Sequence, residues 1–234
     1  MTRSILANSV AACLCFGLSA PLLAAEPPVS AQAAPPSTRS APANTNNDNK
    51  FRAAAEPFEK LAETSFEATL TAIDQTIGEA ETAAQGVRAL LPTGVASHLD
   101  AQIAAMKSAR QKRDHAGLAL SSIEAFRVLI SAVADNAKVP TEVSLLDYAG
   151  FRYGADLKAN PVRWGDMAEA VSFARDNWAK LSPRTKSFQG ASAFEKAIAD
   201  MDKAAAQRNV ALATLSAKAE LDLVDQLEIF FSAH

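Results

Sequence analysis

Two stretches decide the fold: residues 97–121, SHLDAQIAAMKSARQKRDHAGLALS, and residues 192–216, SAFEKAIADMDKAAAQRNVALATLS. Both are rich in Ala, Leu, Lys and Gln, and their larger apolar residues recur at the spacing of one helix face. At a constant offset of 95 residues, six non-alanine positions match: Ser97 with Ser192, Ile103 with Ile198, Met106 with Met201, Arg113 with Arg208, Leu120 with Leu215, and Ser121 with Ser216. These matches predict a duplicated helical hairpin.

Four long helices are predicted, over residues 57–91, 97–134, 141–183 and 192–231. Ser97 with Asp100, and Ser192 with Glu195, have the spacing of capping pairs at the starts of the second and fourth helices. Pro161 follows Asn160 inside the third helix, which predicts a kink or a restart there. The expected fold is all-α, an up-down-up-down four-helix bundle with its third helix kinked near Pro161.

Residues 1–25 have the pattern of a secretory signal peptide. Arg3 is their only charged residue, an apolar run covers residues 5–23, and small residues lead to a cleavage position near Ala25. The run is too short and too interrupted for a convincing membrane anchor. The protein is therefore expected to be periplasmic or secreted. Lipidation at Cys13, after Val10-Ala11-Ala12, is the alternative.

Residues 26–50 are predicted to be a disordered tether, because Pro, Ala, Ser and Asn dominate and almost no large apolar residue is available for burial. The bundle domain is expected to occupy residues 51–234, with no membrane span after the signal. The chain carries 23 Lys and Arg against 26 Asp and Glu, without a basic block. Nucleic acid is therefore not an expected partner.

Cysteine and histidine usage limits the chemistry of the domain. Cys13 and Cys15 both lie in the predicted signal, which leaves no disulfide, no thiolate nucleophile and no Cys-x-x-Cys-His motif, so covalent c-type haem is excluded. His98 and His115 are 17 positions apart on one predicted helix, about 25 Å, and cannot share a ligand. No metal site and no other cofactor are predicted.

The first candidate binding site consists of polar residues that fall in the phase of the buried stripe on helical wheels. On the second helix these are Arg113 and Glu124. On the fourth, Arg208 and Gln226 lie within the stripe and Asp222 lies on its edge. Buried charges must be paired, reach water or line a polar cavity. One hypothesis is that Arg113 and Arg208 face each other inside the bundle and hold an anionic ligand; the other is a structural network of arginines and carboxylates.

The second candidate site is an aromatic patch on the third helix, in an otherwise aromatic-poor chain. It comprises Asp147, Tyr148, Arg152, Tyr153, Asp156 and Trp164. Tyr148, Arg152 and Asp156 share one row of the helix, and Arg152 with Asp156 has the spacing of an ordinary surface ion pair. The patch indicates either burial on both sides of the helix or contact with a partner protein.

The function expected from these features is that of an exported, non-catalytic helical bundle that binds a small ligand or a metal cation through polar groups within the bundle. The alternative is an interaction or structural module of the cell envelope that uses the aromatic patch. An enzyme is not expected, because the sequence holds no Gly-x-Ser-x-Gly elbow and no phosphate loop. Two carboxylates with raised pKa values in one water-accessible cleft would indicate an enzyme instead. The sequence does not determine the oligomeric state.

Overall fold

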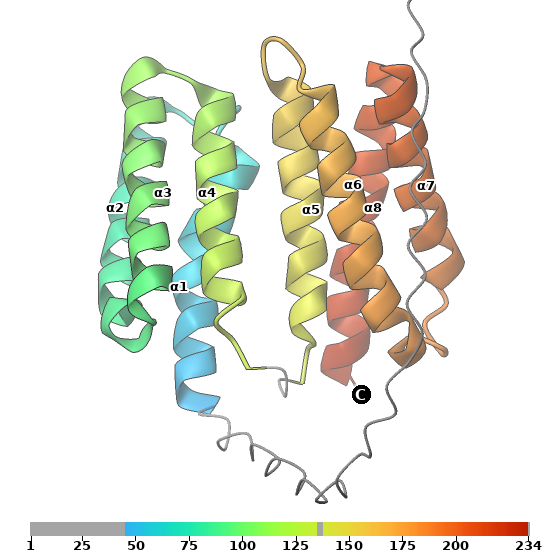
Figure 1. Cartoon of the computed structure of the whole chain (residues 1–234), viewed down its shortest axis with the longest axis horizontal. Coiled ribbons are helices and arrows are strands. Elements are labelled where there is room, and N and C mark those ends of the chain that lie inside the picture. Colours follow the sequence, from blue (N-terminus) through green and yellow to red (C-terminus); the bar gives the residue numbers. More distant parts are fainter. Residues whose placement is uncertain (1–44, 135–137, 234) are drawn as a thin grey trace, which may run out of the picture. The chain divides into compact units, whose positions relative to one another are not determined.

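The computed structural model describes residues 45–134 and 138–233, and the regular structure of these residues is helical (Figure 1). The predicted signal peptide and most of the predicted tether lie outside these residues. The helices are α1 (Thr45–Thr64), α2 (Leu70–Val87), α3 (Thr93–Lys112), α4 (His115–Ile130), α5 (Thr141–Lys158), α6 (Trp164–Leu181), α7 (Ala191–Gln207) and α8 (Val210–Ala233), with short 3₁₀ turns at Arg88–Leu90 and Ser182–Arg184. None of these described helices has the length and apolar character needed to span a membrane.

The all-α fold class is confirmed, but the described residues form eight helices where four long ones were predicted. Each predicted helix is interrupted once, and three of the interruptions have a side-chain cap at the next helix. Thr69 Oγ1 accepts a hydrogen bond from the backbone N–H of Ala72, Asp114 Oδ1 from that of Gly117, and Asn209 Oδ1 from that of Leu212. Thr, Asp and Asn are favoured at such positions because their oxygens satisfy unpaired donors of the first turn. The fourth interruption falls at Pro161, as predicted.

Helix starts also differ from the prediction. α1 begins at Thr45, inside the segment predicted as a tether, and Pro57 lies within α1 rather than at its first position. α3 and α7 begin at Thr93 and Ala191, so Ser97 does not cap a helix. Its hydroxyl instead donates to the carbonyl of Thr93. The capping-pair spacing was misleading because the same pattern also occurs inside a helix.

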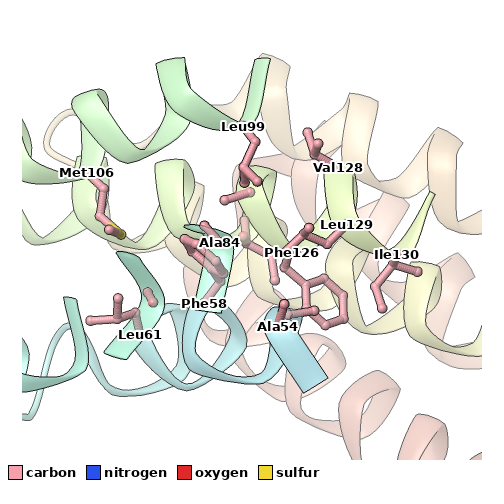
Figure 2. Close-up of a cluster of buried hydrophobic side chains, with 14 of the residues drawn as sticks. Ala54, Phe58, Leu61, Ala84, Leu99, Met106, Phe126, Val128, Leu129 and Ile130 are labelled. Atoms are coloured by element: carbon pink, nitrogen blue, oxygen red, sulfur yellow. The ribbon is translucent and has the colours of Figure 1, made fainter. Parts of the chain in front are cut away.

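Two hydrophobic cores hold the described helices together. Side chains from α1, α2, α3 and α4 form the first, and Figure 2 shows Phe58, Leu61, Leu99, Met106 and Phe126 converging from these helices. The second core is formed by α5, α6, α7 and α8, and its members include Tyr153, Met167, Trp178, Phe194 and Met201. The described helices belong to one compact unit, in which α4 contacts α5 (Figure 1).

Helix α5 lies between the two cores. It contacts α4 and α1 on one side and α6 and α8 on the other. Tyr148 belongs to the first core, whereas Tyr153, five residues further along α5, belongs to the second. This position explains the two apolar stripes of α5, since side chains on more than one face of the helix are buried.

Positions 95 residues apart share local geometry at several of the matched pairs. Arg113 and Arg208 follow α3 and α7 and both have left-handed backbone angles, with φ of 55° and 51°. Met106 and Met201 are both fully buried. Ser121 and Ser216 both donate to the carbonyl four residues earlier.

Arg113→Gly should stabilise the protein, because a residue with a Cβ is strained at positive φ and glycine is not. The expected gain is about 0.5–1 kcal/mol in the free energy of unfolding, measured by urea denaturation. Arg113→Ala, which keeps the Cβ, serves as the control and should give no such gain. A loss of stability in Arg113→Gly would mean that the arginine side chain itself stabilises the fold.

Candidate functional site

The structure separates the residues of the first predicted site. Arg113 and Arg208 are exposed residues at the ends of α3 and α7. The predicted interior position of these two arginines is therefore wrong, and they do not enclose an anion inside the bundle. The helical wheel failed because it continued one helix across a break, which changes the direction of every later side chain.

The other members of that set lie apart from the arginines. Glu124 on α4 accepts hydrogen bonds from Arg127 and from the Tyr148 hydroxyl. Asp222 is exposed on α8, where Lys218 donates to it at 2.6 Å, and Gln226 donates to the Asp222 backbone carbonyl at 3.1 Å. Of the five residues, only Asp222 lines a sizeable cleft.

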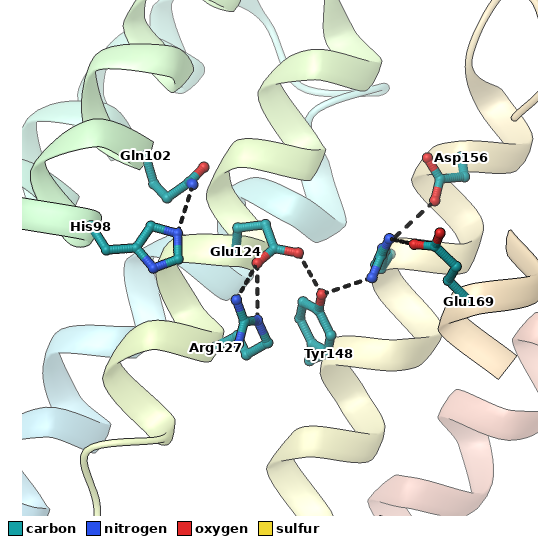
Figure 3. A network of polar contacts seen from close by, with 8 residues as sticks. His98, Gln102, Glu124, Arg127, Tyr148, Asp156 and Glu169 are labelled. Carbon is teal, nitrogen blue, oxygen red and sulfur yellow. Dashed lines mark hydrogen bonds and ion pairs between the residues drawn. The ribbon is translucent and has the colours of Figure 1, made fainter. Parts of the chain in front are cut away.

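Glu124 belongs to a chain of polar contacts that connects α4, α5 and α6 (Figure 3). Arg152 Nη1 donates to the Tyr148 hydroxyl at 3.3 Å, and Arg152 Nη2 pairs with Glu169 at 3.0 Å. Arg152 also lies 3.9 Å from Asp156. Tyr148, Arg152 and Asp156 do share one row, as predicted. However, Asp156 is only 1% exposed, so the prediction of an ordinary surface pair is wrong.

Burial raises pKa values within this network of polar contacts. Burial, followed by the hydrogen bond to Glu124, raises the pKa of Tyr148 to about 12. Burial also raises the pKa of Asp156 to about 7, with a smaller contribution from Asp166, although Arg152 and Arg163 act in the opposite direction. Most charged groups in this network have an opposite charge or a hydrogen-bond donor nearby. A structural role therefore accounts for the network.

The second predicted site is not a single surface. The Tyr153 side chain is fully buried, and its hydroxyl donates to the Met201 carbonyl at 2.9 Å. Trp164 is half-buried at the first position of α6. Asp147 points to yet another side of α5, where it lines a cleft. The residues diverge because α5 is surrounded by helices, so each row of its side chains meets a different neighbour.

A cleft of about 870 Å³ lies between α1, α5 and α8. Seven acidic residues and three lysines line it: Glu56, Glu59, Glu63, Glu67, Asp147, Asp222 and Asp225, with Lys60, Lys158 and Lys218. Two of the lysines are already engaged with carboxylates, Lys60 with Glu79 at 3.6 Å and Lys218 with Asp222 at 2.6 Å. The cleft therefore has an excess of negative charge, which attracts cations.

Asp147 is the most unusual residue of the cleft. It is 7% exposed, and no hydrogen bond or ion pair to it occurs among the described residues. A buried carboxylate without a partner is costly, because it loses hydration and gains nothing in return. Burial raises the pKa of Asp147 well above its usual range, and the negative charges of Glu59, Glu228, Glu220 and Asp225 add to this effect.

Glu59 faces the same region from α1. Its pKa is raised to about 7, first by burial and then by Glu228, Glu63, Glu56 and Asp225. Arg52 offsets part of the charge of Glu228, and its guanidinium donates to the Val139 carbonyl at 3.1 Å. The carboxyl groups at this end of the cleft thus repel one another and lack a sufficient number of positive partners.

Glu220 of α8 lies against Gly150, a glycine that lines the cleft. It is completely buried, and neither of its carboxylate oxygens has a hydrogen-bond partner among the described residues. Burial raises its pKa well above the usual range. Glycine at position 150 makes room for it: a Cβ there would overlap Glu220 Oε2 and would lie 2.6 Å from Leu221 Cδ2.

The acidic end of the cleft could be only partly predicted from the sequence. Asp147 and Asp222 were named, but in two separate candidate sites, and neither site included Glu59 or Asp225. No local spacing relates Glu59 to Asp147, because they are 88 positions apart and meet only through helix packing. Within the described residues, no three His, Cys, Asp or Glu side chains are grouped so that they could hold a metal ion.

Comparisons with known proteins do not assign the chain to a family. No protein-family model, no curated protein and no solved structure matches it.

Proposed function

We propose that this protein is an exported, non-catalytic binding protein that holds a small cationic ligand in the acidic cleft between α1, α5 and α8. The observation that carries the proposal is Asp147, a carboxyl that is 7% exposed, lines the cleft and lacks a hydrogen-bonding or ionic partner among the described residues. A cation beside it would supply the missing partner and would relieve the repulsion from Glu59 and Asp225.

The composition of the cleft favours an organic cation over a bare metal ion. Its walls include the apolar side chains of Phe66, Phe151, Leu157 and Leu221. Apolar walls contribute to binding only when the ligand has apolar surface to bury against them. The envelope-interaction alternative has less support, because Tyr148 and Tyr153 are buried and cannot contact a partner at the surface.

Binding without catalysis is the simpler interpretation of the paired carboxyls. Glu59 and Asp147 share one cleft and both have raised pKa values, so the feature expected of an enzyme is present, and one carboxyl could act as an acid and the other as a base. The described residues that line the cleft include no His, Cys or Ser to serve as a nucleophile, and the hydroxyl of Thr214 already donates to the Val210 carbonyl. The binding experiment must therefore also establish whether the ligand is recovered unchanged.

Replacement of Asp147 by Asn tests the proposal. Asparagine keeps the shape of the side chain but removes its charge, so the affinity for butylammonium should fall at least about tenfold, which corresponds to the loss of one desolvated charge interaction. Isothermal titration calorimetry at pH 8 would measure this affinity, with Ca²⁺ and Zn²⁺ as comparison ligands. Asp176→Asn, an exposed position on α6, is the matched control and should bind as the wild type does.

Several outcomes would overturn parts of this proposal. Absence of binding to any of the three cations, or equal affinity in Asp147→Asn, would contradict a cation site in the cleft. Binding of a metal ion alone, dependent on Asp147, would replace the organic ligand by a metal. A new product in the NMR spectrum of the recovered ligand would show that the protein is an enzyme.

Export is part of the proposal and rests on the signal-like pattern of residues 1–25, which lie outside the described residues. Mass spectrometry of the protein from the periplasmic fraction should find an N-terminus near Glu26. A protein recovered from the cytoplasm with its first 25 residues intact would contradict export, and a lipid on Cys13 would support the lipoprotein alternative.

We also propose that the chain arose by duplication, with α1–α4 and α5–α8 as the two copies. The matches at an offset of 95 residues support this origin, as do the shared left-handed turns of Arg113 and Arg208. The repeated unit would then be four helices rather than the hairpin of two long helices predicted from the sequence.

A further inference from the structure

We infer that the ligand of the acidic cleft is a primary ammonium group carried on an extended apolar body, which lies along α5 with its charge at Asp147. This inference rests on the proposed function and specifies the chemical class of the ligand. It follows from how charge and apolar surface are distributed along the cleft, from one end to the other.

One end of the cleft is acidic. Asp147 of α5 lines it together with Glu59 of α1 and Asp225 of α8, and the negative charges of Glu59 and Asp225 act on the Asp147 carboxyl. Asp147 is also the most deeply buried of the acidic residues that line the cleft. An ammonium group fits this end, because it carries one positive charge and three N–H donors for carboxylate oxygens.

The middle of the cleft is small and apolar. Gly150 of α5 lies against Leu221 of α8, and Gly154, one turn further along α5, has no side-chain or backbone atom within 4 Å of the position that a Cβ would take. Ala155 and Ala217 also line this part of the cleft. Small residues here leave an open channel that a chain of methylene groups can occupy.

The far end is aromatic and carries a positive charge of its own. Lys158 Nζ lies 4.6 Å from the centre of the Phe66 ring, and Leu157 and Val210 line the same region. A second positive charge on the ligand would meet Lys158 there, whereas an apolar tail would contact Phe66. Glu63 and Glu67 are exposed to solvent, so they attract a cation less strongly than Asp147 does.

The length of the channel sets the length of the ligand. Lys158 is eleven positions after Asp147 on α5, and a rise of about 1.5 Å per residue gives a channel of about 16 Å. A short amine would fill only the acidic end. A longer monoamine would also bury its chain, and each methylene removed from water should improve the affinity roughly fourfold.

A series of alkylamines tests this inference by calorimetry at pH 8. Affinity should rise from butylammonium to hexylammonium to octylammonium by roughly fourfold per methylene. Octanol and octanoate should bind at least tenfold more weakly than octylammonium, because they lack the positive charge. The diammonium ion of 1,8-diaminooctane should also bind more weakly than octylammonium, because its second charge would lie near Lys158.

Gly154→Leu provides a variant that should fold. Glycine is unfavourable inside a helix, and a Cβ at position 154 would meet no atom of another element within 4 Å, so the backbone accommodates a larger residue. The leucine would block the channel about 10 Å from Asp147. Octylammonium affinity should then fall at least about fourfold, the loss of one buried methylene, while butylammonium binding stays unchanged. Gly78→Leu, an equally open glycine on α2 outside the cleft, is the matched control.

The outcomes separate this inference from the proposed function. If the amines bind through Asp147 with the same affinity at every chain length, the cation site stands and the apolar channel is wrong. If diaminooctane binds more tightly than octylammonium, the ligand is a polycation instead. If Gly154→Leu leaves the affinity for octylammonium unchanged, the alkyl chain of the ligand does not lie along α5. If no amine binds, or binding does not depend on Asp147, both proposals fail together.

Discussion

The free energy of unfolding should fall by about 4 kcal/mol or more as the pH rises from 5 to 8. The cause is a set of carboxyl groups whose pKa values are raised in the folded protein: Glu59 and Asp156 to about 7, and Asp147 and Glu220 well above their usual range. In the unfolded chain, the same groups lose their protons near pH 4. Between these values the folded state holds protons that the unfolded state has released, so stability decreases as the pH rises.

Asp156 shows how strongly one such carboxyl can change the free energy of unfolding with pH. Its side chain is 1% exposed, and its pKa rises from 3.8 to about 7. At about 1.4 kcal/mol per pKa unit, this group alone contributes up to about 4 kcal/mol, present below pH 4 and lost as the pH approaches 7. The guanidinium groups of Arg152 and Arg163 lie 3.9 Å from the Asp156 carboxylate, too far for hydrogen bonds that would hold the charged form.

Urea denaturation at pH 5, 6, 7 and 8, followed by circular dichroism, measures this dependence. Asp156→Asn removes one titrating group. The pH dependence of the free energy of unfolding should become weaker by the contribution of that group. Asp176→Asn, at an exposed position, should leave the curve unchanged. A stability that stays constant, or that increases between pH 5 and pH 8, would show that the buried carboxyls ionise without cost.

Glu220→Met should stabilise the protein by about 1–3 kcal/mol at pH 8. Glu220 is completely buried with both carboxylate oxygens unpaired among the described residues, so folding removes its hydration without replacement. Methionine has a similar length, adapts to the space and has no charge. Because burial raises the pKa of Glu220, the protonated form, which is less costly to bury, is favoured as the pH falls, so the gain should be smaller at pH 5.

The melting temperature and the urea midpoint measure the effect of Glu220→Met. Glu195→Met, on the exposed face of α7, is the control and should change stability by less than about 0.5 kcal/mol. Gly150→Ala should act in the opposite direction, because its Cβ would overlap the Glu220 carboxyl. If Glu220→Met is instead less stable than the wild type, the carboxyl makes a stabilising interaction that outweighs its burial.

Composition and periodicity were sufficient to predict the all-α class, but not the number of helices. The break at Arg113 and Asp114 escaped detection because the apolar stripe continues on both sides of it. Asp114 and Asn209 were the available signals, since both residue types favour the first cap of a helix. Without these breaks, the helical wheel placed Arg113 and Glu124 on one face, whereas in the structure Arg113 lies in the break between α3 and α4, and Glu124 lies on α4.

Predicting the candidate cleft requires knowledge of tertiary packing even more than predicting the number of helices does. Asp147 was singled out because it borders an aromatic cluster, and its burial follows from the position of α5 between both cores. Glu59 and Asp225, by contrast, resemble many other acidic residues on helix surfaces. They become distinctive only when α1 and α8 both flank α5, and no pattern within one helix predicts that arrangement.

The three walls of the cleft come from helices that are far apart in the sequence, and this separation matters during biosynthesis. α1, α5 and α8 emerge from the ribosome in that order, so the first two walls exist before the third is synthesised. Asp225 and Leu221 belong to the last helix, and a chain truncated after α7 therefore lacks part of both the acidic end and the channel. Ligand binding would thus distinguish full-length molecules from C-terminally clipped ones, and an occupied cleft would protect α8 from proteases by tying it to α1.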